Sequence, residues 1–351
     1  MEVLQVLNES GELAGQAPAS MGEAEIVEAM RWMLLSRAID ERVIALQRMG
    51  LAGVYGPVAG QEAAVVGSAM ALDPARDWMV PASREQPAMV RHGQTLDRVL
   101  AGYMGRLNHA RIPNGVRLLP RQSAIGTQIP HAVGLAWGLK LRRQRAAVMV
   151  YFGEGAASEG DFHEACNLAG VMAVPLVLIL INNHWAISTP ASRQSAAASL
   201  ASRAEGYGFP GVAVDGDDIF AMYSAAREAV DRALRGQGPT LIEARTYRMG
   251  FHNTSDNPRE YRAAAEEEEA GRRDPIDRLR RFATRIGLWS DDIHARVKAE
   301  VTAEVDAAYR LCAELPPPSA EDVFEHVYAE LPPRLQKQRG ESLKAGPSGE
   351  G

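Results

Sequence analysis

Two apolar runs separated by a helical segment constrain the fold of this chain more than any other feature of its sequence. Residues 147–152 and 174–181 are almost continuously apolar and partly β-branched. Between them, Phe162, Cys166 and Ala169 recur at helical spacing. Strands that are apolar on both faces and alternate with helices are typical of a parallel sheet covered on both sides. We therefore expect an α/β fold, doubly wound around a mainly parallel sheet.

A glycine-rich turn with a single carboxylate follows the first apolar run. Phe152 is followed by Gly153-Glu154-Gly155, and Ser158 precedes Asp161 by the three residues typical of a capped helix start. Gly155 allows the backbone to approach a ligand closely, and the N–H groups of a helix start favour an anion. Taken alone, such a turn suits either a dinucleotide-type site or a purely structural role.

Two asparagines make a metal site the better interpretation. Asn182 and Asn183 follow the second apolar run as Glu154 follows the first, and a right-handed crossover brings the carboxyl ends of parallel strands together. Carboxylate and amide oxygens suit Mg²⁺, which takes its remaining ligands from phosphate and water. A helix terminus contributes only about 0.3–1 kcal/mol to anion binding, whereas micromolar affinity requires about 8 kcal/mol. We therefore predict a diphosphate bridged to the protein through Mg²⁺.

Composition and charge exclude several classes of function. The 351-residue chain is 46% hydrophobic and has a formal net charge of −6 with scattered arginines, so we expect no nucleic-acid or membrane partner. Cys166 and Cys312 alone give neither a disulfide framework nor a zinc-ligand spacing. No apolar segment is long enough to span a bilayer, and an acidic N-terminus is not typical of a secretory signal or a transit peptide. These features predict a cytoplasmic protein.

Periodicity and composition divide the chain into four predicted segments. Apolar residues recur at helical spacing over 23–49, and the acidic turn 215–218 is interpreted as the cap of a helix over 219–234. After a proline-rich break, residues 323–331 are predicted to form a last helix. The four segments are an N-terminal arm (1–22), a ligand-binding α/β domain (23–262), a C-terminal helical extension (263–331) and a polar, disordered tail (332–351).

Together these motifs resemble those of a known enzyme family. Gly153-Glu154-Gly155 followed by Asn182-Asn183 resembles the thiamine diphosphate motif. The run over 153–190 closely resembles the α subunit of the decarboxylating component of branched-chain 2-oxo acid dehydrogenase complexes, whose close relatives are pyruvate and acetoin dehydrogenase α subunits. The likeness extends over about residues 60–289. It implies thiamine diphosphate and Mg²⁺ as cofactors.

The resemblance also assigns residues to the cofactor. It implies that Mg²⁺ is held by Glu154, Asn183 and the backbone carbonyl of Trp185. Arg84 would reach the diphosphate, because a guanidinium forks onto phosphate oxygens, whereas a surface salt bridge is the alternative for this residue. The implied cofactor-binding residues are Arg84, Ser123, Ile125, Glu154, Gly155, Ala156, Asn183 and His252.

Three residues receive more specific roles from the resemblance. Ser123 would hydrogen-bond the aminopyrimidine, and Ile125 would support the cofactor between its two rings. His252 lies in residues 245–258, which closely resemble the histidine-containing phosphorylation loop of the branched-chain type. There it matches the catalytic histidine that touches the cofactor and assists acyl transfer, although a lone loop histidine is usually a surface residue. Asn253 replaces the regulated serine of the animal enzymes, so that kinase switch should be absent.

The family pattern is matched unevenly around the site. The residues near Thr127 and Gln128 imply a structural monovalent cation such as K⁺. Ser83, however, stands where tyrosine is usual, Ile181 stands where relatives often carry a polar or basic residue, and segment 106–122 looks shorter than its counterpart. These departures keep open a non-catalytic, thiamine diphosphate-binding scaffold subunit.

The resemblance implies oxidative decarboxylation of a branched-chain 2-oxo acid, of the 2-methylpropanoyl-transferring type. The acyl group would pass to a lipoyl carrier on a separate acyltransferase component. In this family a β subunit supplies the glutamate that acts on the aminopyrimidine, and this chain has no second α/β domain to carry one. We therefore expect a half-site and an α₂β₂ heterotetramer. A pyruvate or acetoin dehydrogenase α subunit is the alternative enzyme.

Overall fold

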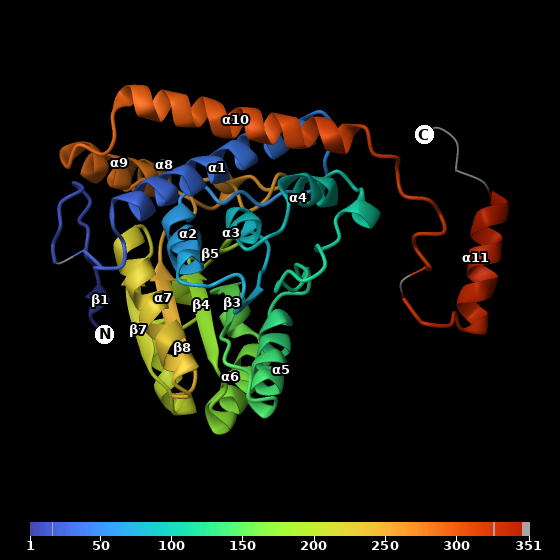
Figure 1. Ribbon diagram of the computed structural model, residues 1–351, viewed down its shortest axis with the longest axis horizontal. Helices are drawn as coiled ribbons and strands as arrows, with labels where there is room; N and C mark the ends of the chain where they lie inside the picture. Colours follow the sequence, from blue (N-terminus) through green and yellow to red (C-terminus); the bar gives the residue numbers. More distant parts are fainter. Residues whose placement is uncertain (16, 326, 346–351) are drawn as a thin grey trace.

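The computed structural model describes residues 1–15, 17–325 and 327–345. Its centre is a six-stranded sheet in the order β1-β7-β8-β4-β3-β2, in which every neighbouring pair is parallel (Figure 1). The prediction of a doubly wound, mainly parallel sheet is confirmed. The strands are β1 (Val3–Leu4), β2 (Trp78–Val80), β3 (Val148–Gly153), β4 (Leu176–Asn182), β7 (Gly211–Asp215) and β8 (Thr240–Arg245).

The two apolar runs of the sequence form β3 and β4 in the middle of the sheet. Successive side chains point to opposite faces of a strand, and both faces are buried here. Met149 and Tyr151 belong to one hydrophobic core, whereas Val148 and Val150 belong to a second. The first core is closed by α1 (Glu23–Arg48), α2 (Glu62–Met70), α7 (Ile219–Leu234), α9 (Pro275–Arg285) and α10 (Asp291–Ala313), and the second by α5 (Gln128–Leu141) and α6 (Gly160–Met172).

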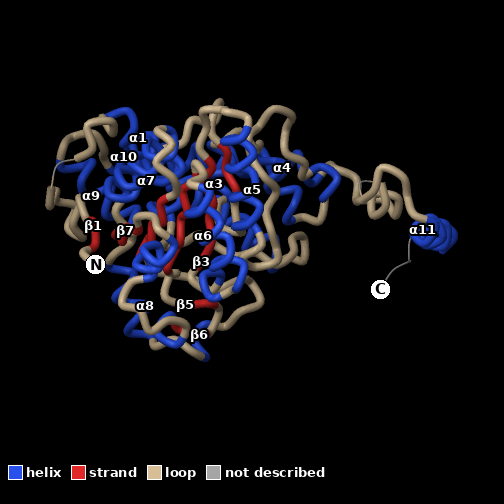
Figure 2. Tube along the Cα trace, turned by 90° about the horizontal axis from the view of Figure 1, so that it is seen from below, coloured by secondary structure: helices blue, strands red, loops and turns tan. Residues whose placement is uncertain are grey.

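The remaining elements lie around this sandwich. Helix α10 lies across α1 at the top of Figure 1, and the two helices contact each other. Beyond the carboxyl edge of the sheet, α8 (Ala264–Arg272) lies beside the hairpin of β5 (Trp185–Ala186) and β6 (Thr189–Pro190), as Figure 2 shows. The short helices α3 (Gln86–Arg91) and α4 (Leu96–Tyr103) and the helix α11 (Pro333–Ala345) complete the set. Among the described residues, none of the helices has the length and apolarity needed to cross a bilayer.

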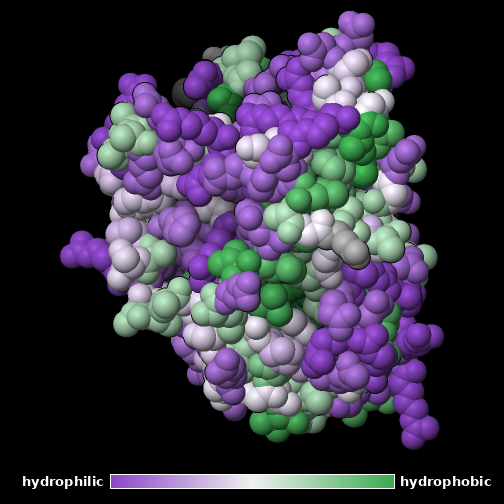
Figure 3. Space-filling model, turned by 90° about the vertical axis from the view of Figure 1, so that its left-hand side faces the viewer, coloured by the Kyte–Doolittle hydropathy of each residue, from purple (hydrophilic) through white to green (hydrophobic). Residues whose placement is uncertain are grey.

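The N-terminal arm lies on the body of its own chain. Strand β1 pairs with β7, and the carboxylate of Asp218 accepts the backbone N–H groups of Val6 and Leu7 at 2.6 and 2.7 Å. The same carboxylate caps α7 by accepting from the N–H groups of Phe220 and Ala221. The predicted capped helix over 219–234 is therefore confirmed. An edge strand of only two residues offers little backbone for further pairing. The face on this side of the molecule is mixed, with green hydrophobic patches between purple hydrophilic residues (Figure 3).

Three local predictions were wrong: the cap at Ser158, the helix over 323–331 and the disordered tail. Ser158 does not cap α6, because residues 156–158 form a short 3-10 turn that includes it, and the helix begins at Gly160 without a side-chain cap. Among the described residues of 323–331 there are turns but no helix, since Val323 and Val327 find no core to pack against and stay exposed.

The predicted disordered tail instead contains α11, which lies apart from the body in Figure 1. This helix begins at a proline and is rich in arginine, lysine, glutamine and leucine, all favourable helix residues. Residues 346–351 of that prediction lie outside the described residues. The boundaries of the other three predicted segments stay predictions.

We expect Asp218→Ala to lower the free energy of unfolding by roughly 2–4 kcal/mol, because it removes a helix cap and leaves buried N–H groups without acceptors. Asp277, an exposed acid in the first turn of α9, gives a matched control whose alanine variant should change stability by less than about 0.5 kcal/mol. Urea unfolding of the two variants measures the difference. Equal losses would show that Asp218 does not tie the arm to α7.

Candidate functional site

The register of β3 and β4 places Glu154 and Asn183 at the same edge of the sheet. Gly153 is paired with Ile181, so each polar residue lies just beyond the end of its own strand. Both line one cavity of about 630 Å³. The cavity is also lined by other residues that the sequence assigned to the cofactor, namely Arg84, Ile125, Gly155, Ala156, Trp185 and His252.

Glu154 is the buried acid of this cavity. Its side chain is 3% exposed, and among the described residues its Oε1 atom has no hydrogen-bond partner. Burial raises the pKa of Glu154, against the N–H groups of Glu154 and Asn183 and the guanidinium of Arg248, which lower it. A buried carboxylate oxygen without a partner carries a large desolvation cost. A divalent cation at this point would remove that cost, so the residue fits the predicted metal ligand.

The side chains of Asn182 and Asn183 have different hydrogen-bond partners, and only Asn183 lines the cavity. Asn182 turns its amide to Glu243, with Nδ2 donating to Oε1 at 2.8 Å. Asn183 faces the cavity, and its Nδ2 donates to Oε1 of Gln61 at 3.0 Å. Its Oδ1 accepts the N–H of Trp185 at 3.2 Å and keeps a second lone pair. Gln61, which sequence reasoning did not assign to the site, therefore orients the amide of the predicted metal ligand.

The described residues contain no group of three His, Cys, Asp or Glu side chains placed to hold a metal. A cation beside Glu154 would therefore depend on amide and peptide oxygens and on oxygens of a ligand, the coordination that Mg²⁺ accepts. The backbone at Gly155 supports close approach, because a Cβ there would lie 3.0 Å from the Cβ of Ala186. Trp185 packs its ring against Tyr261 and donates from Nε1 to Glu266 at 2.7 Å, so its side chain has a structural role.

Arg84 and His252 form a contacting pair in the lining of the same cavity. The Nη2 atom of Arg84 donates to the carbonyl of His252 at 2.7 Å and lies 3.2 Å from its Nδ1, while Nη1 donates to the carbonyl of Pro57. Burial, together with the charges of Arg84 and Arg248, lowers the pKa of His252 to about 4. A guanidinium can only donate, so Nδ1 is the acceptor and the proton of the neutral ring sits on Nε2. Arg84 is thus no surface salt bridge.

The loop that carries His252 is held by residues the sequence did not single out. Asp256 accepts the N–H of His252 and the hydroxyl of Tyr261, both at 2.6 Å. Arg248 is fully buried, donates to Tyr261 at 3.0 Å and to the carbonyl of Ile187 at 2.9 Å, and keeps two N–H groups without acceptors among the described residues. In the sequence, only one feature pointed to Arg248, Asp256 and Tyr261: they lie in or just after the segment that resembles the family loop.

Ser123 is the one predicted cofactor residue outside this cavity. It lines an adjoining cavity of about 1240 Å³, which shares Ser83, Arg84, Ile125 and His252 with the first. Ile125 is 62% exposed, so the described residues leave most of its side chain uncovered. Much of segment 106–122 also lines the adjoining cavity, which places the predicted departure from the family beside the site.

The other predicted departures and the cation site are also near. Ile181 is buried and lines the first cavity, where it offers no charge to a phosphate. Thr127 donates its hydroxyl to the carbonyl of Ala124 at 2.8 Å. Gln128 donates to the carbonyl of Tyr151 at 3.0 Å and has a buried Oε1 without a partner among the described residues. A monovalent cation here stays a prediction.

Comparison with known proteins agrees with this geometry. The profile of the dehydrogenase E1 component family matches residues 30–321. The chain is 38% identical over 339 residues to a protein of Bacillus cereus, covering 96% of this chain and 91% of that one. It is 37% identical over 339 residues to a protein of Staphylococcus aureus strain Mu50, with the same coverage, and 38% identical over 336 residues to one of Bacillus subtilis, covering 95% and 90%.

All three relatives are named pyruvate dehydrogenase E1 component subunit alpha. Their names support a 2-oxo acid dehydrogenase α subunit and agree better with the pyruvate alternative than with the branched-chain prediction. The family itself implies thiamine diphosphate. Because the family profile covers most of the chain and the relatives align over nearly their full length, this chain belongs to the dehydrogenase E1 component family and resembles its α subunits.

Proposed function

We propose that this chain is the α subunit of a thiamine diphosphate-dependent pyruvate dehydrogenase that requires Mg²⁺ and a β subunit. The observation that carries the proposal is one cavity that contains Glu154, a buried acid whose Oε1 atom has no hydrogen-bond partner among the described residues. The same cavity contains the amide of Asn183 and the Arg84–His252 pair. These groups suit the metal and the diphosphate end of one cofactor. A branched-chain 2-oxo acid is the second candidate substrate, favoured by the loop over 245–258.

The residues of the cavity would divide the work of holding the cofactor. Glu154, Asn183 and the carbonyl of Trp185 would bind Mg²⁺, and Arg84 would donate to the diphosphate. Buried Arg248 adds positive charge close to Arg84. Burial lowers the pKa of Arg84 most, and the charge of Arg248 lowers it as well. Two such guanidinium groups in a poorly solvated site favour a polyanion. When bound, thiamine diphosphate supplies the carbanion and electron sink of 2-oxo acid decarboxylation.

His252 would act as a neutral hydrogen-bond donor beside the reacting groups. Its Nδ1 is occupied by Arg84, which leaves the Nε2–H free to donate to a substrate or acyl oxygen. Asp256 fixes the loop backbone, so the ring is positioned before any ligand binds. A neutral donor stabilises a developing negative charge without first having to lose a proton.

The chain supplies only half of such a site. Three acids line the cavity: Glu154 faces the metal position, Glu85 accepts the N–H groups of Ala82 and Arg84 at 2.9 and 3.1 Å, and Glu159 lies exposed. None is left to act on the aminopyrimidine, and Ile125 is open to a covering surface. A β subunit in an α₂β₂ heterotetramer would supply both the acid and the covering surface, with a lipoyl acyltransferase as acyl acceptor.

We also propose a cytoplasmic location for the protein and a structural K⁺ ion near Gln128.

Glu154→Gln should weaken binding of thiamine diphosphate in the presence of Mg²⁺ at least tenfold, a loss of about 1.4 kcal/mol or more, because the neutral amide is a poor metal ligand. Glu164→Gln, an exposed acid on α6, is the matched control and should bind normally. Calorimetric titration, with and without a chelator and a β partner, measures both. Equal affinities in the two variants would refute the metal site, and an absence of any wild-type binding would refute the cofactor.

The imidazole of His252 should stay neutral between pH 6 and 8, because its pKa of about 4 lies below the ordinary 6.5. The unfolded chain takes up this proton first, so His252 should reduce stability as the pH falls from about 6.5 towards 4. NMR titration of the histidine ring signals tests this, with the His252→Gln variant identifying the signal. A midpoint near 6.5 would contradict the proposed environment.

We expect the enzyme to prefer pyruvate, as the names of the relatives indicate, and not the branched-chain 2-oxo acid that the loop over 245–258 favours. The enzyme reconstituted with its β partner should show a kcat/KM for pyruvate at least tenfold above those for 2-oxoisovalerate and acetoin, a difference of about 1.4 kcal/mol. Steady-state rates with the three compounds measure it. A preference for 2-oxoisovalerate would restore the branched-chain prediction, and turnover by the α chain alone would contradict the half-site.

A further inference from the structure

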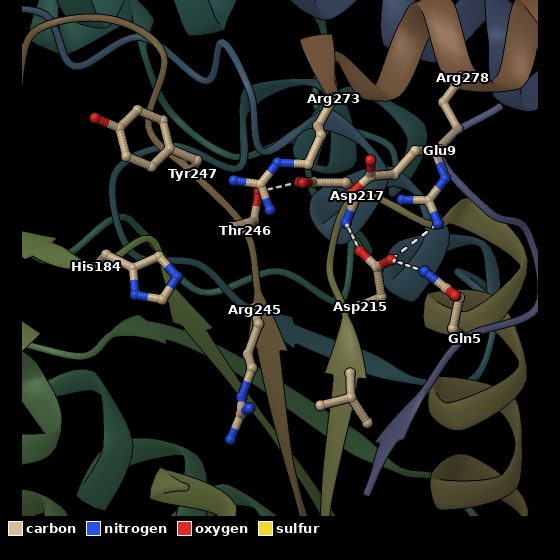
Figure 4. Close-up of a pocket in the computed structure, with 11 residues that line it drawn as sticks. Gln5, Glu9, His184, Asp215, Asp217, Arg245, Thr246, Tyr247, Arg273 and Arg278 are labelled. Carbon is tan, nitrogen blue, oxygen red and sulfur yellow. Dashed lines mark hydrogen bonds and ion pairs between the residues drawn. The ribbon is translucent and has the colours of Figure 1, made fainter. Parts of the chain in front are cut away.

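A second, polar cavity of about 310 Å³ opens at the same edge of the sheet, beyond the ends of β4, β7 and β8 (Figure 4). It is lined by charged side chains from four separate parts of the chain and shares no lining residue with the cavity proposed for the cofactor. The lining residues that matter for its chemistry are His184, Asp215, Asp217, Thr246, Arg273 and Arg278.

One side of this cavity is a closed network that anchors the N-terminal arm. Arg278 donates to Asp215 at 2.8 Å and to the carbonyls of Leu7 and Asn8, and Gln5 donates to the same carboxylate at 2.8 Å. Figure 4 shows these groups turned towards one another. Their charges are balanced, so they offer nothing to a ligand.

Asp217 is mostly protonated at neutral pH and therefore adds little negative charge to the cavity. The Oγ1 atom of Thr246 lies 2.6 Å from the carbonyl of Gly60 and 2.5 Å from Oδ1 of Asp217. The threonine hydroxyl has only one proton for these two acceptors, so both contacts are satisfied together when the carboxyl group of Asp217 is protonated. Burial accordingly raises the pKa of Asp217 to about 8.

Arg273 is the lining arginine whose side chain makes no ion pair among the described residues, although its charge lowers the pKa of Asp217. Its side chain makes no hydrogen bond or ion pair with any described residue, and its Nε atom is buried without an acceptor. In Figure 4 its guanidinium extends into the cavity above Thr246, with His184 across the open space and the guanidinium of Arg245 directed away. The ring of His184 is likewise free of hydrogen bonds among the described residues. A buried N–H group without an acceptor costs roughly 1–3 kcal/mol, which an incoming acceptor would recover.

We propose that this cavity binds a small oxyanion, a carboxylate or a phosphate, between the guanidinium of Arg273 and the imidazole of His184. The planar fork of an arginine matches two oxygens of either group, and the mostly protonated Asp217 repels them little. The exposed Glu9 at the rim is the one nearby carboxylate that could compete.

The position of this oxyanion site gives it access to the neighbouring cavity. Asn183 lines the cavity proposed for the cofactor and His184, the next residue, lines the second one. The N–H of Thr246 also donates to the carbonyl of Asn182 at 3.0 Å, so the turn after β4 forms the wall between them. Binding at the oxyanion site does not depend on the function proposed above.

Calorimetric titration of the full-length chain with inorganic phosphate, and separately with acetate, tests the proposal. Thiamine diphosphate and Mg²⁺ are kept saturating and the ionic strength constant, so that the larger cavity is filled. Arg273→Gln should weaken phosphate or acetate binding at least tenfold. Arg272→Gln is the matched control, because it removes the same charge one residue away from an exposed side chain outside the cavity. The stronger of the two probes identifies the ligand class.

Three outcomes would overturn the proposal. The first is equal binding of phosphate or acetate by the two arginine variants, and the second is no binding of either by the wild-type chain in the millimolar range. The third is binding only after Glu9→Gln, which would show that the carboxylate of Glu9 itself occupies the site. Thermal unfolding of both variants shows whether they are folded. If the wild-type chain fails to bind thiamine diphosphate, the proposed function fails, but loss of phosphate binding in Arg273→Gln and not in Arg84→Gln would still support the oxyanion site.

Discussion

The register between β3 and β4 is the constraint on which the site depends. All seven residues of β4 are buried, and the apolar side chains of both strands are divided between two cores. Burying one large aliphatic side chain contributes roughly 1.5–3 kcal/mol, and a shift of one residue would exchange the two sets of side chains. The register therefore cannot slip. As a result, the first polar residues beyond the strands, Glu154 and Asn183, meet at one fixed position.

Buried polar atoms without hydrogen-bond partners in the described part of the chain indicate that this edge of the sheet binds a charged ligand. Glu154 and Arg248 both keep polar atoms that have no partner among the described residues, although burial of such atoms is costly. Folding tolerates this because the surrounding cores and the Asp256–Tyr261 contacts hold the backbone in place. Glu154 lines the cavity, and the guanidinium groups of Arg84 and Arg248 act electrostatically on its carboxylate, so the site suits a ligand that carries both a cation and an anion. A metal-bridged diphosphate is such a ligand.

Local patterns predicted a large part of this arrangement from the sequence. The strands, the capped helix after Asp218 and the meeting of Glu154 with Asn183 all follow from periodicity and crossover handedness. Contacts such as Gln61 with Asn183 join side chains 122 positions apart, and no spacing rule reveals them. The failed cap at Ser158 shows the same limit, because a short turn shifted the helix start by one residue. The substrate prediction relied on one loop, whereas similarity to relatives is spread along the whole chain.

The surface around the adjoining cavity links the site to assembly. Large apolar side chains that line it are exposed, among them Val54 at 60%, Leu107 at 70% and Ile125 at 62%. Scattered apolar residues on a surface are ordinary, but a group gathered around one cavity marks a surface that a partner covers. Ile125 lies where the two cavities meet, so the same partner would reach the cofactor position. Under the proposed function, the incomplete acid set and the uncovered apolar rim would be two consequences of one division of the active site between chains.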